Sequence, residues 1–297
     1  SGNPNRLEIW EVSSRNFQVS SATAEMSGRN ALVNIVYKLP AGNEFFITYK
    51  IYPDGVMNVS TRFTPAHLDG VKIDISEATA TATFSPGRDA QSVSARDKMV
   101  VPRIGVRFRL PATMNQLAYL GRGPQENYWD RKAGSLIGLY NSTADEEYFP
   151  YVRPQENGHH CDTRWLSLNG RGKSLLIVAD SLMEFNALRN SVEDFDAGKA
   201  INRPYQWNNF TPQEIANRPE IGAYDKPRQT HINDITPRDF VEVCLDLKQQ
   251  GLAGYDSWYS RPEPEYTLPA DREYTWGFTL IPGAGVSQAV KKLKYTY

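Results

Sequence analysis

The sequence predicts an all-β fold, a large antiparallel sandwich, and three observations support this expectation. Apolar and polar residues alternate in several segments, as in 47–52, which is typical of strands that bury one face. Clusters of Gly, Pro and Asn separate these segments and supply turns. Helical patterns of ten to fifteen residues do not alternate with them, so a sandwich is expected rather than a βα barrel.

The clearest element is a β-hairpin. Segment 47–52 leads into Pro53-Asp54-Gly55, a turn sequence, and 57–63 alternates on the way back. Further strands are predicted by the same pattern at 31–39, 78–84, 104–110, 174–179, 240–247 and 274–281. Two short helices are predicted at 211–218, which Thr211-Pro212-Gln213-Glu214 opens as a capping box, and at 287–294.

The remaining stretches at 121–165 and 184–235 have no regular pattern. Loops of that length inside a compact domain are usually functional or form large surface covers. No linker composition divides the chain, so we expect a single domain over 1–297.

Composition excludes several classes of function. The net charge of −1 offers no field for nucleic acid or an anionic membrane surface. The longest apolar run, 175–179, is far too short to cross a bilayer. Cys161 and Cys244 are far apart in sequence and are read as free thiols rather than a disulfide. The four histidines show no metal-binding spacing, so no metal site is predicted.

Polar motifs rich in glycine interrupt the strand pattern. Residues 120–131 read Leu-Gly-Arg-Gly-Pro-Gln-Glu-Asn-Tyr-Trp-Asp-Arg, and Pro-Gln-Glu-Asn recurs at 154–157, before Gly158-His159-His160. Thr163-Arg164-Trp165 follows, and 250–258 read Gln-Gly-Leu-Ala-Gly-Tyr-Asp-Ser-Trp. A sandwich core needs neither the polar side chains nor the glycines of these motifs.

In this order and spacing, from about Trp10 to Pro282, the motifs resemble the small-chain, C-terminal domain (domain 5) of glycoside hydrolase family 2 β-galactosidases. The resemblance implies a super-sandwich similar to galactose mutarotase, beside a catalytic barrel domain of the same polypeptide. It places both catalytic glutamates on that barrel, one of them after an Asn. The Asn-Glu dipeptide of this chain, Asn43-Glu44, stands at the entrance of a hairpin strand. We therefore expect no catalytic residue in this chain.

The family also carries a Trp-Arg-Ala-Pro-x-Asp-Asn-Asp stretch upstream of this domain, which the sequence lacks. The chain is therefore expected to be an N-terminally truncated form of the domain.

The resemblance assigns one substrate-binding residue, Trp258, at the rim of the sugar site. An indole offers the largest flat apolar surface on which a sugar ring can stack. A core position is the alternative, but the flanking glycines, Asp256 and Ser257 indicate an exposed loop. We expect Asp256 and Ser257 to brace that loop rather than touch the sugar.

Other motif residues have two readings. Glu126, Asn127, Glu156 and Asn157 are ligands for sugar hydroxyls or a cation, or they satisfy buried backbone groups, which we favour. If these residues are structural, we expect Arg131 and Arg164 to form ion pairs with the two glutamates. His160, with its neighbour His159, suggests the His/Glu acid–base pair of mutarotases, but a supporting role is preferred. Trp165 and Trp276 are assigned to the core.

The expected function follows from the resemblance. The parent is a retaining β-galactosidase that hydrolyses terminal β-D-galactosides, and this fragment alone is inactive. Mg and Na ions of the parent lie on the barrel, so no cofactor is bound by this domain. Expected partners are a galactoside or other carbohydrate and the barrel domain, in a homo-oligomeric parent, with no nucleic acid and no membrane. The alternatives are a mutarotase-like aldose epimerase and a non-catalytic carbohydrate-binding module.

Overall fold

Antiparallel strands make up most of the protein. The computed structural model describes Trp10, Ser13 and residues 16–39, 42–65, 100–195, 232–255 and 261–283. Within these residues eleven strands form one continuous hydrogen-bonded sheet, and every paired strand is antiparallel. The strands are β1 (Gln18–Ser27), β2 (Asn30–Lys38), β3 (Glu44–Ile51), β4 (Met57–Thr64), β5 (Arg103–Pro111), β6 (Gln116–Gly123), β7 (Leu136–Thr143), β8 (His160–Gly170), β9 (Lys173–Leu188), β10 (Phe240–Gln249) and β11 (Tyr274–Pro282). The all-β, antiparallel prediction is confirmed.

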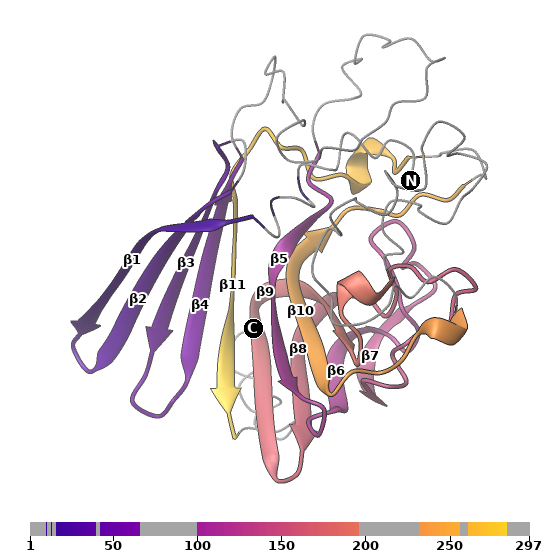
Figure 1. Cartoon of the computed structure of the whole chain (residues 1–297), viewed down its shortest axis with the longest axis horizontal. Coiled ribbons are helices and arrows are strands. Elements are labelled where there is room, and N and C mark those ends of the chain that lie inside the picture. Colours follow the sequence, from indigo (N-terminus) through magenta and orange to yellow (C-terminus); the bar gives the residue numbers. More distant parts are fainter. Residues whose placement is uncertain are drawn as a thin grey trace, which may run out of the picture.

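Strand β9 joins two layers of the fold. The long path runs β1-β2-β3-β4-β11-β9-β8-β6-β7 (Figure 1). Strand β8 pairs with both halves of β9, whereas the other edge of β9 pairs with β11 at 175–179 and with β10 at 184–188. Strand β10 in turn pairs with β5. The change from β11 to β10 falls at the exposed residues 180–182.

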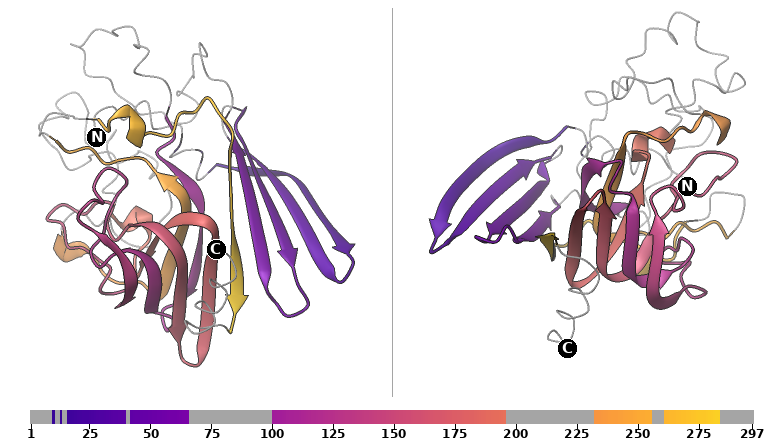
Figure 2. Two further views of the ribbon diagram at one scale, coloured as in Figure 1. Left: turned by 180° about the vertical axis from the view of Figure 1, so that it is seen from behind. Right: turned by 90° about the horizontal axis from the view of Figure 1, so that it is seen from below.

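The core lies between these layers. Val241, Val243 and Leu245 of β10 belong to one buried cluster with Tyr119 of β6 and Leu166 of β8. In Figure 2 the β5–β10 pair packs across β8 and β9, while β1–β4 fan away from this part of the molecule. The buried apolar cluster therefore extends from the covered strands onto β3 and β4. The residues of β1, at the edge of the sheet, are all exposed.

Most predicted strands are present within one to three residues of their expected ends. The hairpin is β3–β4, with Gly55 at φ 82° in its turn, and Asn43-Glu44 stands at the entrance of β3. Trp165 is buried and Trp276 packs against the core, as expected. Cys161 and Cys244 are both free and buried, which confirms the free-thiol reading. The predicted strand at 78–84 and helices at 211–218 and 287–294 lie outside the described residues.

The prediction that 121–165 is irregular was wrong in part. Strand β7 and the first residues of β8 lie within this stretch, and 184–188 belong to β9 rather than to a loop. Strand β7 is an edge strand with exposed apolar residues, and the start of β8 buries polar side chains that are paired internally. Neither case produces an apolar–polar alternation, so periodicity could not reveal these strands.

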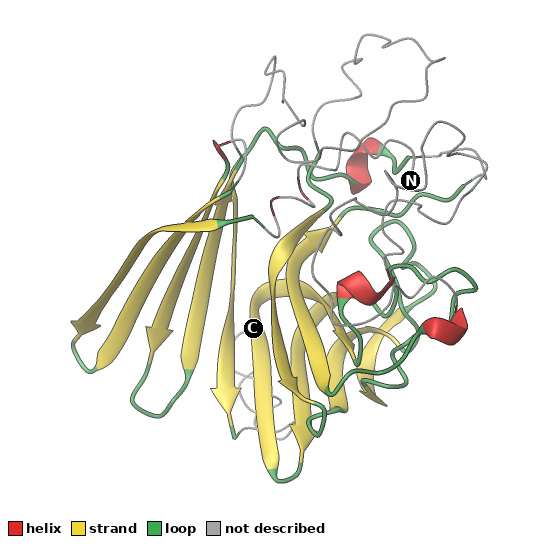
Figure 3. Cartoon of the chain, in the orientation of Figure 1, coloured by secondary structure: helices red, strands yellow, loops and turns green. Residues whose placement is uncertain are grey.

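The helical elements with described bounds are short turns (Figure 3). These are the 3₁₀ turns at Val192–Phe195, Ile232–Asp234 and Pro264–Tyr266. None of the helices among the described residues is long and apolar enough to span a membrane.

Removing a side chain from between the layers tests this core assignment. Leu166 has no exposed surface, whereas Leu136 on edge strand β7 is 72% exposed. We expect Leu166→Ala to lower the free energy of unfolding by about 2–5 kcal/mol, because it removes buried surface and leaves a cavity. Leu136→Ala is expected to change it by less than about 0.5 kcal/mol. Guanidinium denaturation of the two variants checks this, and equal effects would contradict the assigned core.

Candidate functional site

The polar motifs of the sequence converge on one end of the sheet. The backbone N–H of Asn127, in the first Pro-Gln-Glu-Asn segment, donates to the carbonyl oxygen of His159 at 2.7 Å. The N–H of Cys161 donates to the Asn127 side-chain oxygen at 3.0 Å. The loop after β6 is therefore fastened along the residues that open β8.

The asparagines of the two Pro-Gln-Glu-Asn segments make the same pair of hydrogen bonds. Asn127 Nδ2 donates to the carbonyl of Gln125 at 3.1 Å, and Asn157 Nδ2 donates to that of Gln155 at 2.9 Å. Each amide oxygen then accepts a distant backbone N–H, which for Asn157 is that of Phe149 at 3.1 Å. Both asparagines are buried. The repeat is thus a repeated turn whose amide closes a loop, in agreement with the preferred reading.

The two glutamates of the repeat link separate loops. Glu126 pairs with Arg131 at 2.8 Å, as expected, and its other oxygen accepts the N–H of Gly158 in the second motif at 2.8 Å. Glu156 accepts from Asn186 Nδ2 at 3.0 Å and lies 3.5 Å from Arg103. Each carboxylate therefore holds a second chain segment in place.

The expected pairing of Arg164 with a glutamate is not found among the described residues. Its Nη1 donates instead to the carbonyl of Asp162 at 2.6 Å. The guanidinium that serves Glu156 belongs to Arg103, which also binds Asp246 through Nε at 2.8 Å. Arg103 is the first residue of β5 and belongs to no motif, so no sequence signal marked it.

His159 bridges the second motif and β9. Its Nδ1 lies 2.8 Å from Asn186 Oδ1, and its Nε2 lies 3.0 Å from Glu184 Oε2. Because Asn186 Nδ2 donates to Glu156, the facing amide oxygen accepts, and His159 Nδ1 carries a hydrogen. Nε2 faces a carboxylate, so it also donates. The result is a buried imidazolium–carboxylate pair.

The electrostatics agree with this assignment. Burial alone would lower the pKa of His159, but the hydrogen bond and charge of Glu184 outweigh it, and the pKa is raised. Burial alone would raise the pKa of Glu184, yet His159 and Lys248 lower it to about 2. Lys248 Nζ lies 3.1 Å from Glu184 Oε1.

His160 is also fully enclosed. Its Nδ1 lies 2.9 Å from the carbonyl of Arg122 and its Nε2 lies 2.5 Å from Glu147 Oε2. The rings of Tyr119 and Phe185 flank it at centroid distances of 4.7 and 5.0 Å. A mutarotase-type acid–base pair must reach a sugar. Neither histidine has exposed surface and all four ring nitrogens are engaged, so the geometry favours supporting roles.

The described network extends to the loop that precedes Trp258. Asp130 accepts the backbone N–H groups of Leu252 at 3.0 Å and Ala253 at 2.7 Å. A Cβ at Gly251 would come within 2.5 Å of the Asp130 carboxylate, which explains the glycine there. Sequence reasoning missed Asp130, although it stands inside the first motif. Residues 256–260, which include Asp256, Ser257 and Trp258, lie outside the described part.

The neighbours of Asp130 fix its position. Tyr128 stacks on the His159 ring at 5.3 Å with an interplanar angle of 14°. Trp129 meets the ring of Tyr266 edge-on at 6.0 Å, and the carbonyl of Tyr266 accepts the N–H of Gly251 at 2.8 Å. The loop at 251–253 is thus held from both sides by groups that the buried network positions.

One group in this region has the composition of a metal site. The ligand atoms of His159, Cys161 and Glu184 all lie within 4.8 Å of one another. His159 and Glu184 are already bonded to each other, and burial raises the pKa of the Cys161 thiol, which favours its neutral form. The group is accounted for by hydrogen bonding, and the expectation that this domain binds no metal stays a prediction.

Comparison with known proteins places the chain in a family. The family model described as "Beta galactosidase small chain" matches residues 3–280. The chain belongs to the β-galactosidase small-chain family. A β-galactosidase of Priestia megaterium is 30% identical over 282 residues, which cover 93% of this chain and 21% of that protein. One of Arthrobacter sp. (strain B7) is 40% identical over 180 residues, 59% of this chain and 15% of that protein. The chain therefore spans about a fifth or less of these relatives.

Among solved structures, a galactose mutarotase related enzyme from Lactobacillus acidophilus matches with 8% identity and a TM-score of 0.25. The match covers 90% of this chain and 71% of that one. A TM-score this low supports no inference, so the all-β assignment rests on the strand pairing itself.

The buried pair predicts how stability depends on pH. The raised pKa of His159 contributes stability below its unfolded value of about 6.5, which is lost as pH rises through the folded pKa. The lowered pKa of Glu184 contributes stability above about 4.3, which is lost as pH falls toward about 2. We expect these two groups to give maximal stability between about pH 4.3 and 6.5.

Denaturant midpoints measured from pH 4 to 9 test this. The His159→Gln variant should be less stable at pH 6, by up to about 3–5 kcal/mol, because buried Glu184 loses its charged hydrogen-bond donor and keeps only the ion pair with Lys248. It should also lose part of the decline seen above pH 6.5 in the unmodified chain. An identical alkaline decline in both proteins would show that His159 does not carry it.

Proposed function

We propose that this chain is the C-terminal domain of a retaining β-galactosidase, and that it contributes one side of the rim of the sugar site. Membership of the small-chain family supports this, as does the share of about a fifth that the chain represents in its relatives. The single observation that carries the rim role is the pair of hydrogen bonds that Asp130 accepts from the backbone N–H groups of Leu252 and Ala253, in the loop before Trp258. These bonds fix the backbone position of Leu252 and Ala253, from which the chain continues to Trp258.

Trp258 supplies the binding surface in this proposal. A sugar ring presents a C–H face that stacks on an indole, so the residue contacts substrate without taking part in bond cleavage. Asp256 and Ser257 brace the loop. Asp130 acts through the backbone of Leu252 and Ala253, so it is a positioning residue.

The catalytic carboxylates lie in another part of the polypeptide, on a barrel domain. Retaining hydrolysis needs two carboxyl groups about 5–5.5 Å apart that both reach the sugar. The acidic groups of the loop network are committed to other partners: Glu126 to Arg131, Glu147 to His160 and Glu184 to His159. This supports an isolated chain without hydrolytic activity.

The partners of the proposed domain follow from the same role. They are a galactoside and the barrel domain of the same polypeptide, which would also hold the Mg and Na ions of the parent enzyme. The parent is proposed to be a homo-oligomer.

Hydrolysis of a nitrophenyl β-galactoside tests the division of labour. We expect turnover by the full-length polypeptide that contains this chain and none by the 297-residue chain alone, because the acid and the nucleophile lie outside it. Turnover by the isolated chain would contradict the proposal and would place a catalytic pair within this sandwich.

Kinetics of the full-length enzyme test the rim. Trp258→Ala is expected to weaken substrate and product binding about tenfold, roughly 1.4 kcal/mol, with a much smaller change in kcat. Asp130→Asn should shift binding in the same direction by a smaller factor, because an amide can replace only one of the two acceptor oxygens.

Asp145→Asn is the matched control for Asp130, since Asp145 is half exposed and pairs with Arg189 away from the loop. It should leave KM and product inhibition unchanged. Loss of kcat at unchanged binding in Trp258→Ala would refute the platform role.

A further inference from the structure

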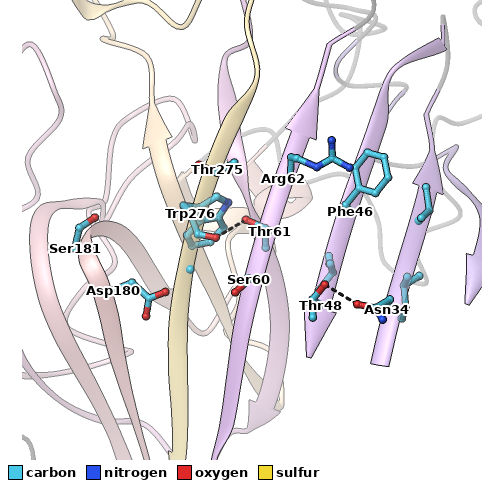
Figure 4. Close-up of a pocket in the computed structure, with 14 residues that line it drawn as sticks. Asn34, Phe46, Thr48, Ser60, Thr61, Arg62, Asp180, Ser181, Thr275 and Trp276 are labelled. Atoms are coloured by element: carbon cyan, nitrogen blue, oxygen red, sulfur yellow. Dashed lines mark hydrogen bonds between the residues drawn. The ribbon is translucent and has the colours of Figure 1, made fainter. Parts of the chain in front are cut away.

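A groove of about 540 Å³ crosses strands β2, β3, β4 and β11, and none of its lining residues belongs to the polar loop network (Figure 4). Three consecutive residues from each of β2, β3, β4 and β11 line it, and it ends at the bend of β9, beside Asp180 and Ser181. Its floor is backbone that is already hydrogen-bonded within the sheet.

Strand register arranges its side chains in two rows. Thr48 pairs with Asn34 on one side and with Ser60 on the other, and Ser60 pairs with Gly277. This polar row ends at Asp180, whose carboxylate lies over Gly277, 2.3 Å from where a Cβ would be. The second row is two positions along each strand and consists of Val36, Phe46, Arg62 and Thr275.

The charge in the groove is confined to one end. The Arg62 guanidinium lies 3.8 Å from the centre of the Phe46 ring and pairs with Glu273 at 3.2 Å, so its charge is already compensated. The side chain of Asp180 has no hydrogen bond or ion pair to another described residue. Its two carboxyl oxygens have no partner among the residues that the structure describes, and partial burial of the carboxyl group raises its pKa.

This chemistry selects the ligand. A nucleic acid needs uncompensated cations, and a peptide that adds a strand needs an open sheet edge, whereas this groove crosses the middle of paired strands. Hydroxyl and amide groups in a row, a carboxylate that can accept two neighbouring hydroxyl groups, and an apolar wall match a neutral sugar chain. Four strands at about 4.8 Å spacing span roughly 15–20 Å, which is longer than one sugar ring.

We propose that this groove binds a neutral oligosaccharide of several residues, at a site separate from the rim at Trp258. The Asp180 carboxylate accepts hydrogen bonds from the sugar hydroxyls, and the Asn34 amide donates to them. The Phe46 side of the groove faces the C–H surfaces of the rings. The site does not rest on the proposed catalytic role, because none of its residues belongs to the loop network.

Calorimetric titration of the 297-residue chain with β-1,4-galactotetraose tests the proposal, with galactose as the short comparison. We expect millimolar binding of the tetraose that is at least about tenfold tighter than that of galactose. Asp180→Ala should weaken it about tenfold, as expected for the loss of hydrogen bonds to a charged group. Ser60→Leu, at an exposed position in the middle of the polar row, should abolish it by filling the groove.

Two control variants separate this site from others. Asn141→Ala, at an exposed position of β7, should leave the affinity for the tetraose unchanged, and Trp258→Ala should leave in place the binding that depends on Asp180 and Ser60. Melting temperatures establish that each variant is folded. No binding by the unmodified chain, or binding that survives both Asp180→Ala and Ser60→Leu, would overturn the proposal. Loss of binding in Trp258→Ala with an intact groove would assign the sugar to the rim and overturn it equally.

Discussion

The bond between His159 and Glu184 is the interaction on which the rest of the loop region depends. A buried charge is tolerated only when it is paired and hydrogen-bonded. Here Asn186 accepts from His159, Glu184 Oε2 accepts from His159 and from the backbone N–H of Gln249, and the Lys248 ammonium pairs with the other oxygen. Asn186 carries the network onward to Glu156 in the second motif and to Arg103 in β5. The irregular loops are thereby fixed to three strands, β5, β9 and β10.

Side chains packed on this network position the loop at 251–253. Tyr128 stacks on the imidazolium, which sets the direction of the Tyr-Trp-Asp-Arg segment, and Asp130 then receives the backbone of the loop at 251–253. The two Pro-Gln-Glu-Asn turns close the loops on either side with the same amide hydrogen bond. A rim that binds a rigid sugar needs this kind of support, because looseness in the platform weakens every contact made on it.

The sequence predicted the strands whose faces differ in polarity, such as the β3–β4 hairpin, and it predicted that the motif asparagines serve the backbone. Strand β7 and the start of β8 were not predicted from the sequence, because an edge strand can expose apolar residues and a buried strand can carry paired histidines. The partners of Glu156 and His159 also could not be foreseen, since Arg103 and Glu184 lie far away in sequence and meet them only through strand pairing. Asp130 was within reach, as an acidic residue between two aromatic motif residues and an arginine.

A double-mutant cycle tests most directly whether this network serves the rim. Product inhibition by galactose would be measured for the full-length enzyme with Asp130→Asn, Trp258→Ala and both changes. If Asp130 acts only by positioning the loop of Trp258, its substitution will weaken inhibition in the unmodified enzyme and have no further effect once the indole is absent. Fully additive effects would contradict the account, because they would mean that Asp130 and Trp258 influence sugar binding independently.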